Sequence, residues 1–265
     1  MTALRAEMKA RVRVVQRELH ARHLYASTID GILGSKTEKA LDAITAIPLT
    51  WPKSRKITAF IQMMCNESSI EAGPMDGYWG PQTAFAFDSL QYLLQYNTLP
   101  PLWRDEKPSL NPNHWPVENE LQQFYGERGE NQSRIQLPYP HRLAWDKRKV
   151  VHSCLCHEKV HDSLERVLRS VLDHYGLEEI KQLRLDLWGG CLNVRKMRGG
   201  SRWSTHSWGV AMDYDPSNNS YKWGRDRAAF AAPVYDPWWQ CWEAEGWQSL
   251  GRRKNYDWMH IQAVR

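Results

Sequence analysis

Two short stretches in the C-terminal half of the chain carry the residue types of a catalytic metal site. His206, Asp213 and His260 offer two imidazoles and one carboxylate. A catalytic zinc ion typically has three protein ligands of these kinds and keeps a fourth position for water. We therefore predict that these three residues bind zinc and that Asp257 is a second carboxylate beside the ion.

The spacing of these residues requires the backbone to bend. An extended strand from His206 to Asp213 would hold the two residues roughly 23 Å apart, whereas ligands lie about 2.0–2.2 Å from a zinc ion. We expect the bend at residues 207–209, followed by a short strand at 210–214. A second strand at 258–262 would carry the other histidine, and the second carboxylate would have to lie just before that strand.

The order Ser-x-His-x-x-Gly-x-Ala-x-Asp, followed downstream by Asp-x-x-His, resembles the motif of a known family. This family contains the zinc D-alanyl-D-alanine carboxypeptidases and L-alanyl-D-glutamate peptidases, including many phage endolysins. Every position of the two-part motif is filled, by Ser204, His206, Gly209, Ala211, Asp213, Asp257 and His260. The resemblance implies an α+β fold, zinc bound by the two histidines and Asp213, and Asp257 as the general base.

The resembled family also uses an arginine ahead of the first zinc ligand. Arg195 is the best match, and Arg198 and Arg202 are close enough to remain alternatives. A guanidinium in this place could stabilise the oxyanion or hold a substrate carboxylate. We further expect Ser204, Trp208 and Arg198 to contact the substrate. Trp203 and Trp258 could line the same groove.

Two other patterns compete for a metal. Residues 157–161 read His-Glu-x-x-His, a zinc protease signature, on a predicted helix, where Glu178 or Glu179 would have to supply the third ligand. Residues 154–157 read Cys-x-Cys-His, but no second ligand pair follows at zinc-finger spacing. We interpret the first pattern as histidines at the edge of a core and the second as ordinary thiols. Glu245 is an alternative base that we read as a solvated carboxylate at a helix end.

The N-terminal third contains a repeat with a period of 46 residues. Gln16 is followed 14 residues later by Asp-Gly-Ile-Leu-Gly-Ser-Lys-Thr at 30–37, and Gln62 is followed 14 residues later by Asp-Gly-Tyr-Trp-Gly-Pro-Gln-Thr at 76–83. Each copy predicts a helix, an Asp-Gly turn and a second helix.

The starts of the second helices are also predicted. Ser35 and Glu38 would form a capping box, and Pro81 suits a first helical position. The whole pattern, over residues 8–96, resembles a peptidoglycan-binding domain found beside cell-wall hydrolases. The plainer interpretation is that Asp-Gly-x-x-Gly is only turn chemistry in a helical scaffold.

Composition narrows the class of protein. The 265 residues carry a formal charge of +5, which would favour an anionic wall but shows no clustered patch for nucleic acid. No apolar run is long enough for a membrane span, and the first twenty residues lack the apolar core of a secretory signal. Five scattered cysteines fit reduced thiols better than disulfides. We expect a monomer in the host cytoplasm before its release to the cell wall.

The chain reads as two domains of an α+β protein. We predict a helical peptidoglycan-binding domain with two repeats at 1–97, a Pro-rich linker at 98–116, and a zinc peptidase domain with a small, mostly antiparallel sheet at 117–265. The elements expected in the last domain are an edge strand at 134–140, a helix at 157–175 stopped by Gly176, a strand at 183–188, a turn at Gly189–Gly190 and a helix at 236–245.

Together these features predict a phage-type endolysin. It would be a zinc-dependent endopeptidase that cuts the stem peptide of peptidoglycan at the L-alanyl-D-glutamate bond. A D,D-carboxypeptidase of the same family and a non-catalytic wall-binding protein are the alternatives.

Overall fold

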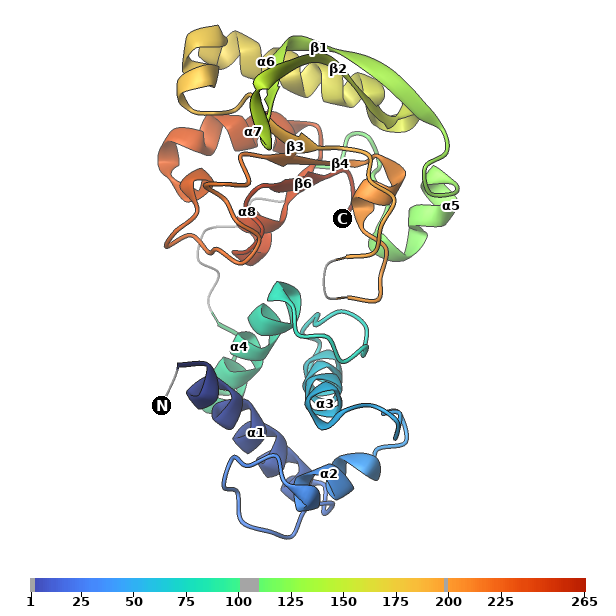
Figure 1. The fold of residues 1–265 in the computed structure, drawn as a ribbon, viewed down its shortest axis with the longest axis vertical. Helices are drawn as coiled ribbons and strands as arrows, with labels where there is room; N and C mark the ends of the chain where they lie inside the picture. Colours follow the sequence, from blue (N-terminus) through green and yellow to red (C-terminus); the bar gives the residue numbers. More distant parts are fainter. Residues whose placement is uncertain (1–2, 101–109, 198–199) are drawn as a thin grey trace. The chain divides into compact units, whose positions relative to one another are not determined.

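The computed structural model describes residues 3–100, 110–197 and 200–265 (Figure 1). The chain forms two compact units. One consists of Met1–Pro101 with Arg198–Ser201, and the other of Leu102–Met197 with Arg202–Arg265. No helix among the described residues combines the length and the apolar character that a membrane span requires.

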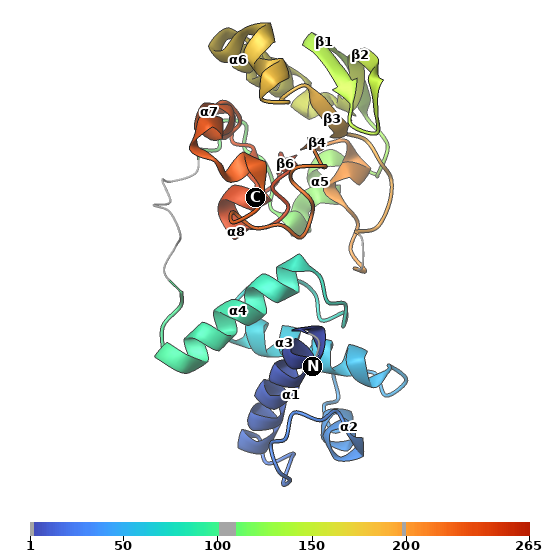
Figure 2. The ribbon, with the colours of Figure 1, turned by 60° about the vertical axis from the view of Figure 1, so that its left-hand side comes forward.

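The first unit is helical. Its described residues form α1 (Ala3–Ala21), α2 (Ser35–Asp42), α3 (Lys53–Glu67) and α4 (Pro81–Tyr96) (Figure 2). Apolar side chains from all four helices form one core, which includes Val15, Leu19, Leu41, Phe60, Ile61 and Phe87.

The first copy of the repeat is organised around the buried side chain of Gln16. Its amide nitrogen donates to Asp30 Oδ1 at 2.9 Å, and its carbonyl oxygen accepts the Gly31 N–H at 2.8 Å. The same nitrogen lies 3.2 Å from the Ile32 carbonyl oxygen and 3.1 Å from Thr37 Oγ1. The glutamine therefore joins α1 to the turn and to the start of α2.

The second copy repeats this arrangement around Gln62. Its amide nitrogen donates to Asp76 Oδ1 at 3.0 Å, and its carbonyl oxygen accepts the Gly77 N–H at 2.8 Å. The nitrogen also lies 3.3 Å from the Tyr78 carbonyl oxygen and 3.2 Å from Thr83 Oγ1. The repeat seen in the sequence is thus a repeated hydrogen-bond network.

The turn glycines are required by this geometry. Gly31 and Gly77 have φ angles of 76° and 71°. A Cβ atom would lie 2.8 Å from the Lys9 carbonyl oxygen in the first copy and 2.7 Å from the Arg55 carbonyl oxygen in the second. Glycine alone combines this backbone conformation with so close an approach.

The helix starts differ in part from the prediction. Pro81 is the first residue of α4, as predicted. The predicted capping box of Ser35 and Glu38 is wrong, because Gly34 is the N-cap of α2 and Ser35 already lies inside the helix. Glu38 instead forms an ion pair with Lys53 Nζ at 2.9 Å.

The second unit contains one mixed sheet flanked by helices. Its described strands lie in the order β2 (Asp146–His157), β1 (Gln132–Leu143), β3 (Leu187–Gly190), β4 (Ala211–Tyr214), β6 (His260–Gln262) and β5 (Gln248–Ser249). The helices are α5 (Leu121–Tyr125), α6 (Glu158–Gln182), α7 (Asp236–Ala244) and α8 (Leu250–Lys254), with 3-10 turns η1 (Glu118–Glu120), η2 (Thr205–Trp208), η3 (Ala229–Ala231) and η4 (Pro233–Tyr235).

The sheet is mostly antiparallel, as expected, with one parallel pair. β1 and β3 run parallel. The chain reverses direction in β2 and comes back through α6 before it enters β3, which gives β3 the direction of β1. The prolines of residues 134–140 were predicted to mark an edge, and β1 pairs with β3 only at Arg142 and Leu143, so residues 134–140 have no partner in β3. Pro138 and Pro140 fall where the β1–β2 register shifts, between Gln136 and His141, so no ladder hydrogen bond is lost there.

The elements around α6 also correct the prediction. Gly176 interrupts the helix with φ 66° and ψ 168°, but a further helical segment continues to Gln182. The strand predicted at 183–188 begins only at Leu187, because Arg184 has φ 60°. Gly189, predicted in a turn, belongs to β3.

A large aromatic core holds the second unit together. It includes Trp238, Trp239, Trp242, Trp247 and Trp258, each at most 1% exposed. Trp258 packs against α8, where a Cβ at Gly251 would lie 2.4 Å from its ring. Trp258 therefore belongs to the core and does not line a substrate groove.

Candidate metal centre

Three elements bring the predicted ligands together. Asp213 on β4 and His260 on β6 are direct partners in the antiparallel register, so their side chains leave the sheet on the same face. His206 lies in η2, immediately before β4. The two strands and the intervening bend agree with the sequence prediction.

Two glycines allow this close assembly. Gly209 ends η2 with φ 69°, and a Cβ there would lie 2.3 Å from the side-chain oxygen of Gln132. A Cβ on Gly189 of β3 would lie 2.9 Å from the Cβ of Asp213. The bend therefore needs Gly209, and the position of the carboxylate ligand depends on Gly189.

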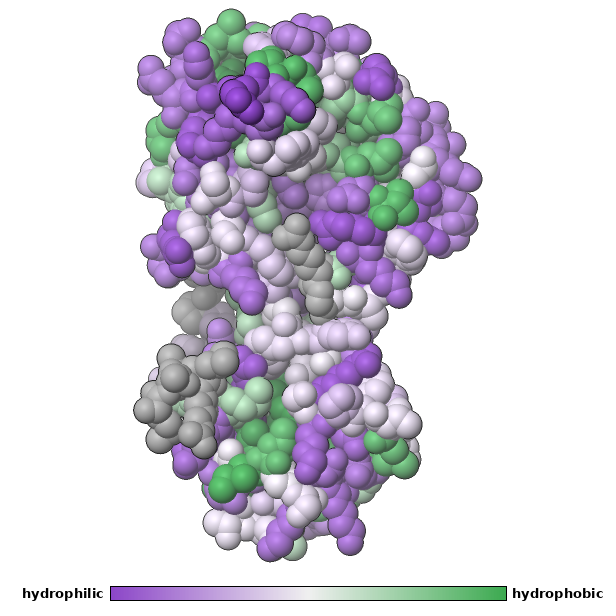
Figure 3. Space-filling view, viewed as in Figure 1, coloured by the Kyte–Doolittle hydropathy of each residue, from purple (hydrophilic) through white to green (hydrophobic). Residues whose placement is uncertain are grey.

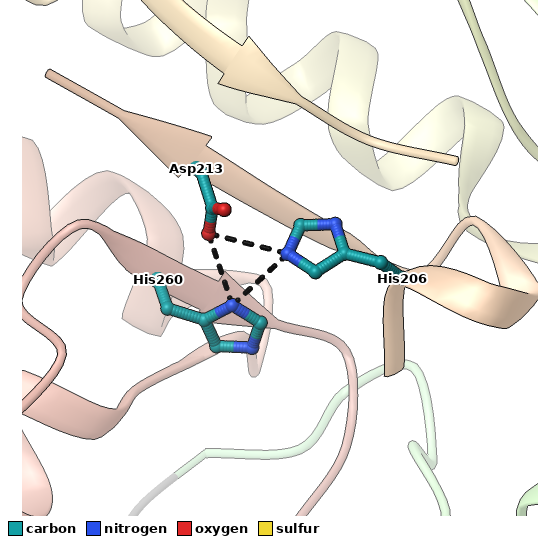
Figure 4. A group of neighbouring side chains, drawn as sticks. All are labelled: His206, Asp213 and His260. Carbon is teal, nitrogen blue, oxygen red and sulfur yellow. Dashed lines mark hydrogen bonds and ion pairs between the residues drawn. The ribbon is translucent and has the colours of Figure 1, made fainter. Parts of the chain in front are cut away.

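The three ligand atoms form a nearly equilateral triangle (Figure 4). His206 Nε2 lies 3.2 Å from Asp213 Oδ1, His260 Nδ1 lies 3.0 Å from the same oxygen, and the two nitrogens are 3.2 Å apart. In a tetrahedral site with bonds of about 2.0–2.1 Å, ligand atoms lie about 3.3–3.4 Å apart. The three residues therefore fit a four-coordinate ion such as zinc with only a slight outward adjustment.

Hydrogen bonds on the far side of each ring orient the histidines. His206 Nδ1 lies 2.6 Å from the Cys191 carbonyl oxygen, and His260 Nε2 lies 3.0 Å from Gln262 Oε1. Thr205 Oγ1 donates to the same Gln262 oxygen at 3.3 Å. Each acceptor holds a ring N–H and so directs the lone pair of the other nitrogen toward the centre of the triangle.

Sequence reasoning missed these supporting residues for different reasons. Gln262 lies two positions after His260 on the same side of a predicted strand. The sequence therefore predicted that the two side chains are neighbours, but it did not indicate that Gln262 accepts a hydrogen bond from the imidazole. The Cys191 carbonyl is a backbone group, which no residue type could signal. It also lies 15 residues from His206 in the sequence.

The electrostatics of the triangle favour a cation. Burial disfavours charge on Asp213, but His206 and His260 together hold the pKa of its carboxyl well below the ordinary value. Burial likewise opposes charge on His260, but the hydrogen bond and charge of Asp213 raise the pKa of this imidazole to about 9. Without a metal, a proton therefore takes the place of the positive charge.

Asp257 lies three residues before β6 and is joined to His260 through the backbone. It has a left-handed φ of 54°, and it is 8% exposed. Its N–H donates to the Tyr221 carbonyl oxygen at 3.1 Å, while its own carbonyl oxygen accepts the His260 N–H at 3.0 Å. Its charge also contributes to the raised pKa of His260.

The structure separates the candidate arginines. The Arg195 backbone N–H donates to Ser207 Oγ at 3.1 Å, and its guanidinium donates to the Lys196 carbonyl oxygen at 3.1 Å. Arg202 forms an ion pair with Glu118. Arg198 lies outside the described residues.

Ser204 and Trp208 flank His206 in the sequence and are both buried. The Ser204 N–H donates to the Arg195 carbonyl oxygen at 3.1 Å, and this hydrogen bond joins the backbone at Arg195 to the start of η2. Trp208 is 4% exposed, and its indole N–H donates to the Gly126 carbonyl oxygen at 2.8 Å. Trp203 is 38% exposed and is the more accessible of the two tryptophans.

Another arginine at this surface was not predicted. The Arg128 guanidinium carbon lies 4.4 Å from the ring centre of Trp203 and 5.7 Å from that of Trp208. No sequence signal could have found it, because it lies 75 positions before the first of these rings.

The competing metal pattern at 157–161 is used structurally. His157 is the N-cap of α6 and is fully buried, and its Nε2 lies 2.7 Å from the Tyr125 carbonyl oxygen. Its Nδ1 accepts the Lys159 N–H at 3.1 Å. Both ring nitrogens are thus engaged, and among the described residues the group of three potential ligands is His206, Asp213 and His260.

The remaining alternatives also have structural roles. Glu245 forms an ion pair with Arg166 at 2.7 Å and accepts from Asn113 at 2.9 Å, so its carboxylate is already bound. Cys154 and Cys156 are buried and unpaired by disulfide, and burial raises the pKa of each thiol to about 12.

Comparison with protein-family models, curated proteins and solved structures found no match for this chain.

Proposed function

We propose that this protein is a zinc-dependent endopeptidase of the phage endolysin type, which hydrolyses the stem peptide of peptidoglycan at the L-alanyl-D-glutamate bond. The observation that carries the proposal is the triangle of His206, Asp213 and His260. The charge of Asp257 acts on the last of these residues. The two-part sequence motif that contains the same four residues supports the peptidase class.

The residues of the site divide the chemistry among them. A zinc ion held by the triangle would supply the acidity that activates water and polarises the peptide carbonyl. Asp213 contributes one negative charge and so leaves a net positive charge for that purpose. Asp257 accepts a proton at its carboxylate during attack and returns it to the leaving amine.

An arginine would complete the site by stabilising the oxyanion or the substrate carboxylate. Arg195 remains the proposed residue, because its backbone is tied to η2 through Ser207 and Ser204. Ser204 and Trp208 are buried beside His206, and we propose that they shape the side of the site that faces the substrate.

The helical unit is the proposed wall-binding part. Its repeat network uses Gln16, Asp30, Gln62 and Asp76 to build two turns, so these four side chains serve the scaffold. A glycan would therefore have to contact the residues that this scaffold presents at its surface.

Digestion of purified peptidoglycan tests the function. Mass spectrometry of the products should show a new N-terminal D-glutamate, and a chelator should abolish the product while added zinc restores it. Released D-alanine would reassign the protein as a D,D-carboxypeptidase. Absence of any product from zinc-loaded protein would leave wall binding as its function.

A further inference from the structure

The tip of the β1–β2 hairpin combines an exposed tryptophan with a run of cations. Trp145 is 66% exposed. Among the other tryptophans of the described residues, Trp203 is the most exposed, at 38%, and the rest are partly or fully buried. The next residues include Lys147, Arg148 and Lys149, all exposed. The side chain of Arg148 is 94% exposed and that of Lys149 is 71% exposed.

Neither face of β2 is covered at this tip. Residues 147–150 are exposed in succession, although alternate residues of a strand point to opposite faces. Nearer the base, Cys154 and Cys156 are buried in the core shared with α6. The hairpin therefore extends beyond its helical cover, and β2 is an edge of the sheet. Figure 3 shows hydrophilic side chains interspersed with hydrophobic ones over the hairpin and α6.

The charge of the tip is positive after local pairing is counted. Three cations face one carboxylate, Asp146, which lies 3.4 Å from Arg148 Nε and 3.9 Å from Lys149 Nζ. Arg142 adds no further charge because Asp186 binds it through two hydrogen bonds of 2.5 and 2.8 Å.

Protection of an edge strand explains only part of this composition. Charged side chains on β2 would prevent pairing with another chain. An exposed Trp145 followed by Val150, which is 49% exposed, works against such protection. Aromatic rings beside lysine and arginine are instead the composition of segments that lie at the headgroup level of a bilayer.

We propose that the hairpin tip, residues 144–150, docks onto the surface of a phospholipid bilayer with anionic headgroups. The three cations attract the headgroup phosphates, and Trp145 and Val150 enter the interface between headgroups and acyl chains. The surface is a protruding tip, which fits a bilayer better than a nucleic acid that would need a basic groove along its backbone. This docking does not depend on the proposed peptidase activity.

Flotation of the full-length protein with vesicles tests the docking. The protein should float with vesicles of phosphatidylglycerol and phosphatidylethanolamine and stay behind with vesicles of phosphatidylcholine. Each basic residue near an anionic surface contributes about fivefold to binding. The triple variant Lys147→Gln, Arg148→Gln, Lys149→Gln should therefore bind about a hundredfold more weakly, and Trp145→Ala about tenfold more weakly.

A matched control separates this site from the overall charge. The variant Arg17→Gln, Lys36→Gln, Lys39→Gln removes three exposed cations from the helical unit and should bind vesicles like the wild type. Equal loss in both triple variants would overturn the proposal, as would wild-type binding by the hairpin variant. Thermal unfolding of each variant checks that the fold is intact.

Two further measurements identify the occupant. Brominated lipid should quench the part of the fluorescence that Trp145→Phe removes, and an unquenched Trp145 would contradict insertion. The protein could instead bind duplex DNA more tightly than vesicles at the same salt and lose this binding in the hairpin variant. That result would show that the tip binds nucleic acid and not a bilayer. Chelated protein should bind vesicles normally, so a failed peptidase assay leaves this result unaffected.

Discussion

Gln16 in the helical unit and Asp213 in the sheet unit are both polar groups at the centre of a buried cluster, but their neighbours differ. The Gln16 amide donates to oxygen atoms and accepts a backbone N–H, so donors and acceptors match within the protein. Around Asp213 the carboxylate oxygen meets the nitrogens of two imidazoles, whose other nitrogens already face acceptors.

This difference distinguishes a polar cluster that builds structure from one that binds something. A network in which every group has a partner stabilises its turn and offers nothing to a ligand. Three lone-pair atoms held 3.0–3.2 Å apart repel one another unless a proton or a metal cation lies between them. The unmatched cluster is therefore where a ligand is expected, and the matched clusters explain the repeat.

The largest effect is expected when one of the three proposed ligands, His206, Asp213 or His260, is removed. His206→Ala should reduce bound zinc from one equivalent to none and lower turnover by about 10⁴-fold or more, because catalysis would lose its Lewis acid. Elemental analysis and the muropeptide assay measure the two effects. His161→Ala removes a histidine of the competing pattern and should keep both zinc and activity. The opposite result would move the metal to α6.

Asp257→Asn should separate binding from chemistry at the same cluster. The amide keeps the shape of the side chain but cannot accept the proton, so kcat should fall by about 10²- to 10⁴-fold while zinc remains bound. Glu245→Gln is the matched control, since its carboxylate is held by Arg166 and Asn113. Activity that survives in Asp257→Asn and disappears in Glu245→Gln would exchange their roles.

The matched cluster should respond in stability and leave the chemistry unchanged. Gln62→Ala leaves the Gly77 N–H without its buried partner and removes one of several donors to the Asp76 carboxylate, at a cost of about 1–3 kcal/mol. Chemical unfolding and faster hydrogen exchange at the Gly77 amide would show this loss. Gln16→Ala should behave alike, and the exposed Gln95→Ala should change stability by less than about 0.5 kcal/mol. A loss of turnover on a short soluble muropeptide would contradict the separation of roles.

The sequence made the elements of the candidate metal centre predictable because their signals are local. Gly209 marks the bend, and the apolar residues around Asp213 and His260 mark the two strands. The 46-residue period likewise predicted two equivalent turns. The hydrogen bond from each glutamine to its turn was not predicted, because it joins residues 14 positions apart through a glutamine that is ordinarily a surface residue.

The β1–β2 hairpin shows where such local reasoning succeeds and where it fails. Pro138 and Pro140 indicated an edge, and their segment of β1 has no partner in β3. The basic residues of β2 gave no alternating pattern, because both faces of its first half are exposed. Tertiary placement decided this exposure, and neither residue type nor period reported it.

A smaller effect is expected from the residue that orients His260. Gln262→Leu removes the acceptor of the His260 Nε2 proton, so the ring loses its fixed tautomer and zinc affinity should fall by about 10- to 100-fold. Competition with a chelator of known affinity measures the change. Gln123→Leu, at an exposed position of α5, provides a control of the same chemistry. Unaltered zinc affinity in Gln262→Leu would mean that the strand alone orients the ring.

The smallest effect concerns the proton that replaces the metal. In the chelated protein the pKa of His260 is about 9, above the ordinary value of an unfolded histidine, so the folded state holds an extra proton between these values. Its contribution to stability is complete below pH about 6.5 and is lost as the pH rises through about 9. The free energy of unfolding should therefore fall in this window by at most about 1.4 kcal/mol per pH unit.

Bound zinc should remove this slope, because the metal takes the position of the proton and His260 is then neutral in both the folded and unfolded states. The stabilisation by zinc, measured as the difference in unfolding free energy between loaded and chelated protein, should increase from pH 6.5 to 8.5. Asp213→Asn removes the carboxylate that raises the His260 pKa, so the chelated variant should show a flat profile over the same range. If the free energy of unfolding still falls with pH in this variant, the extra proton is bound at another group. The triangle would then lack the affinity for positive charge on which its proposed role as a metal centre depends.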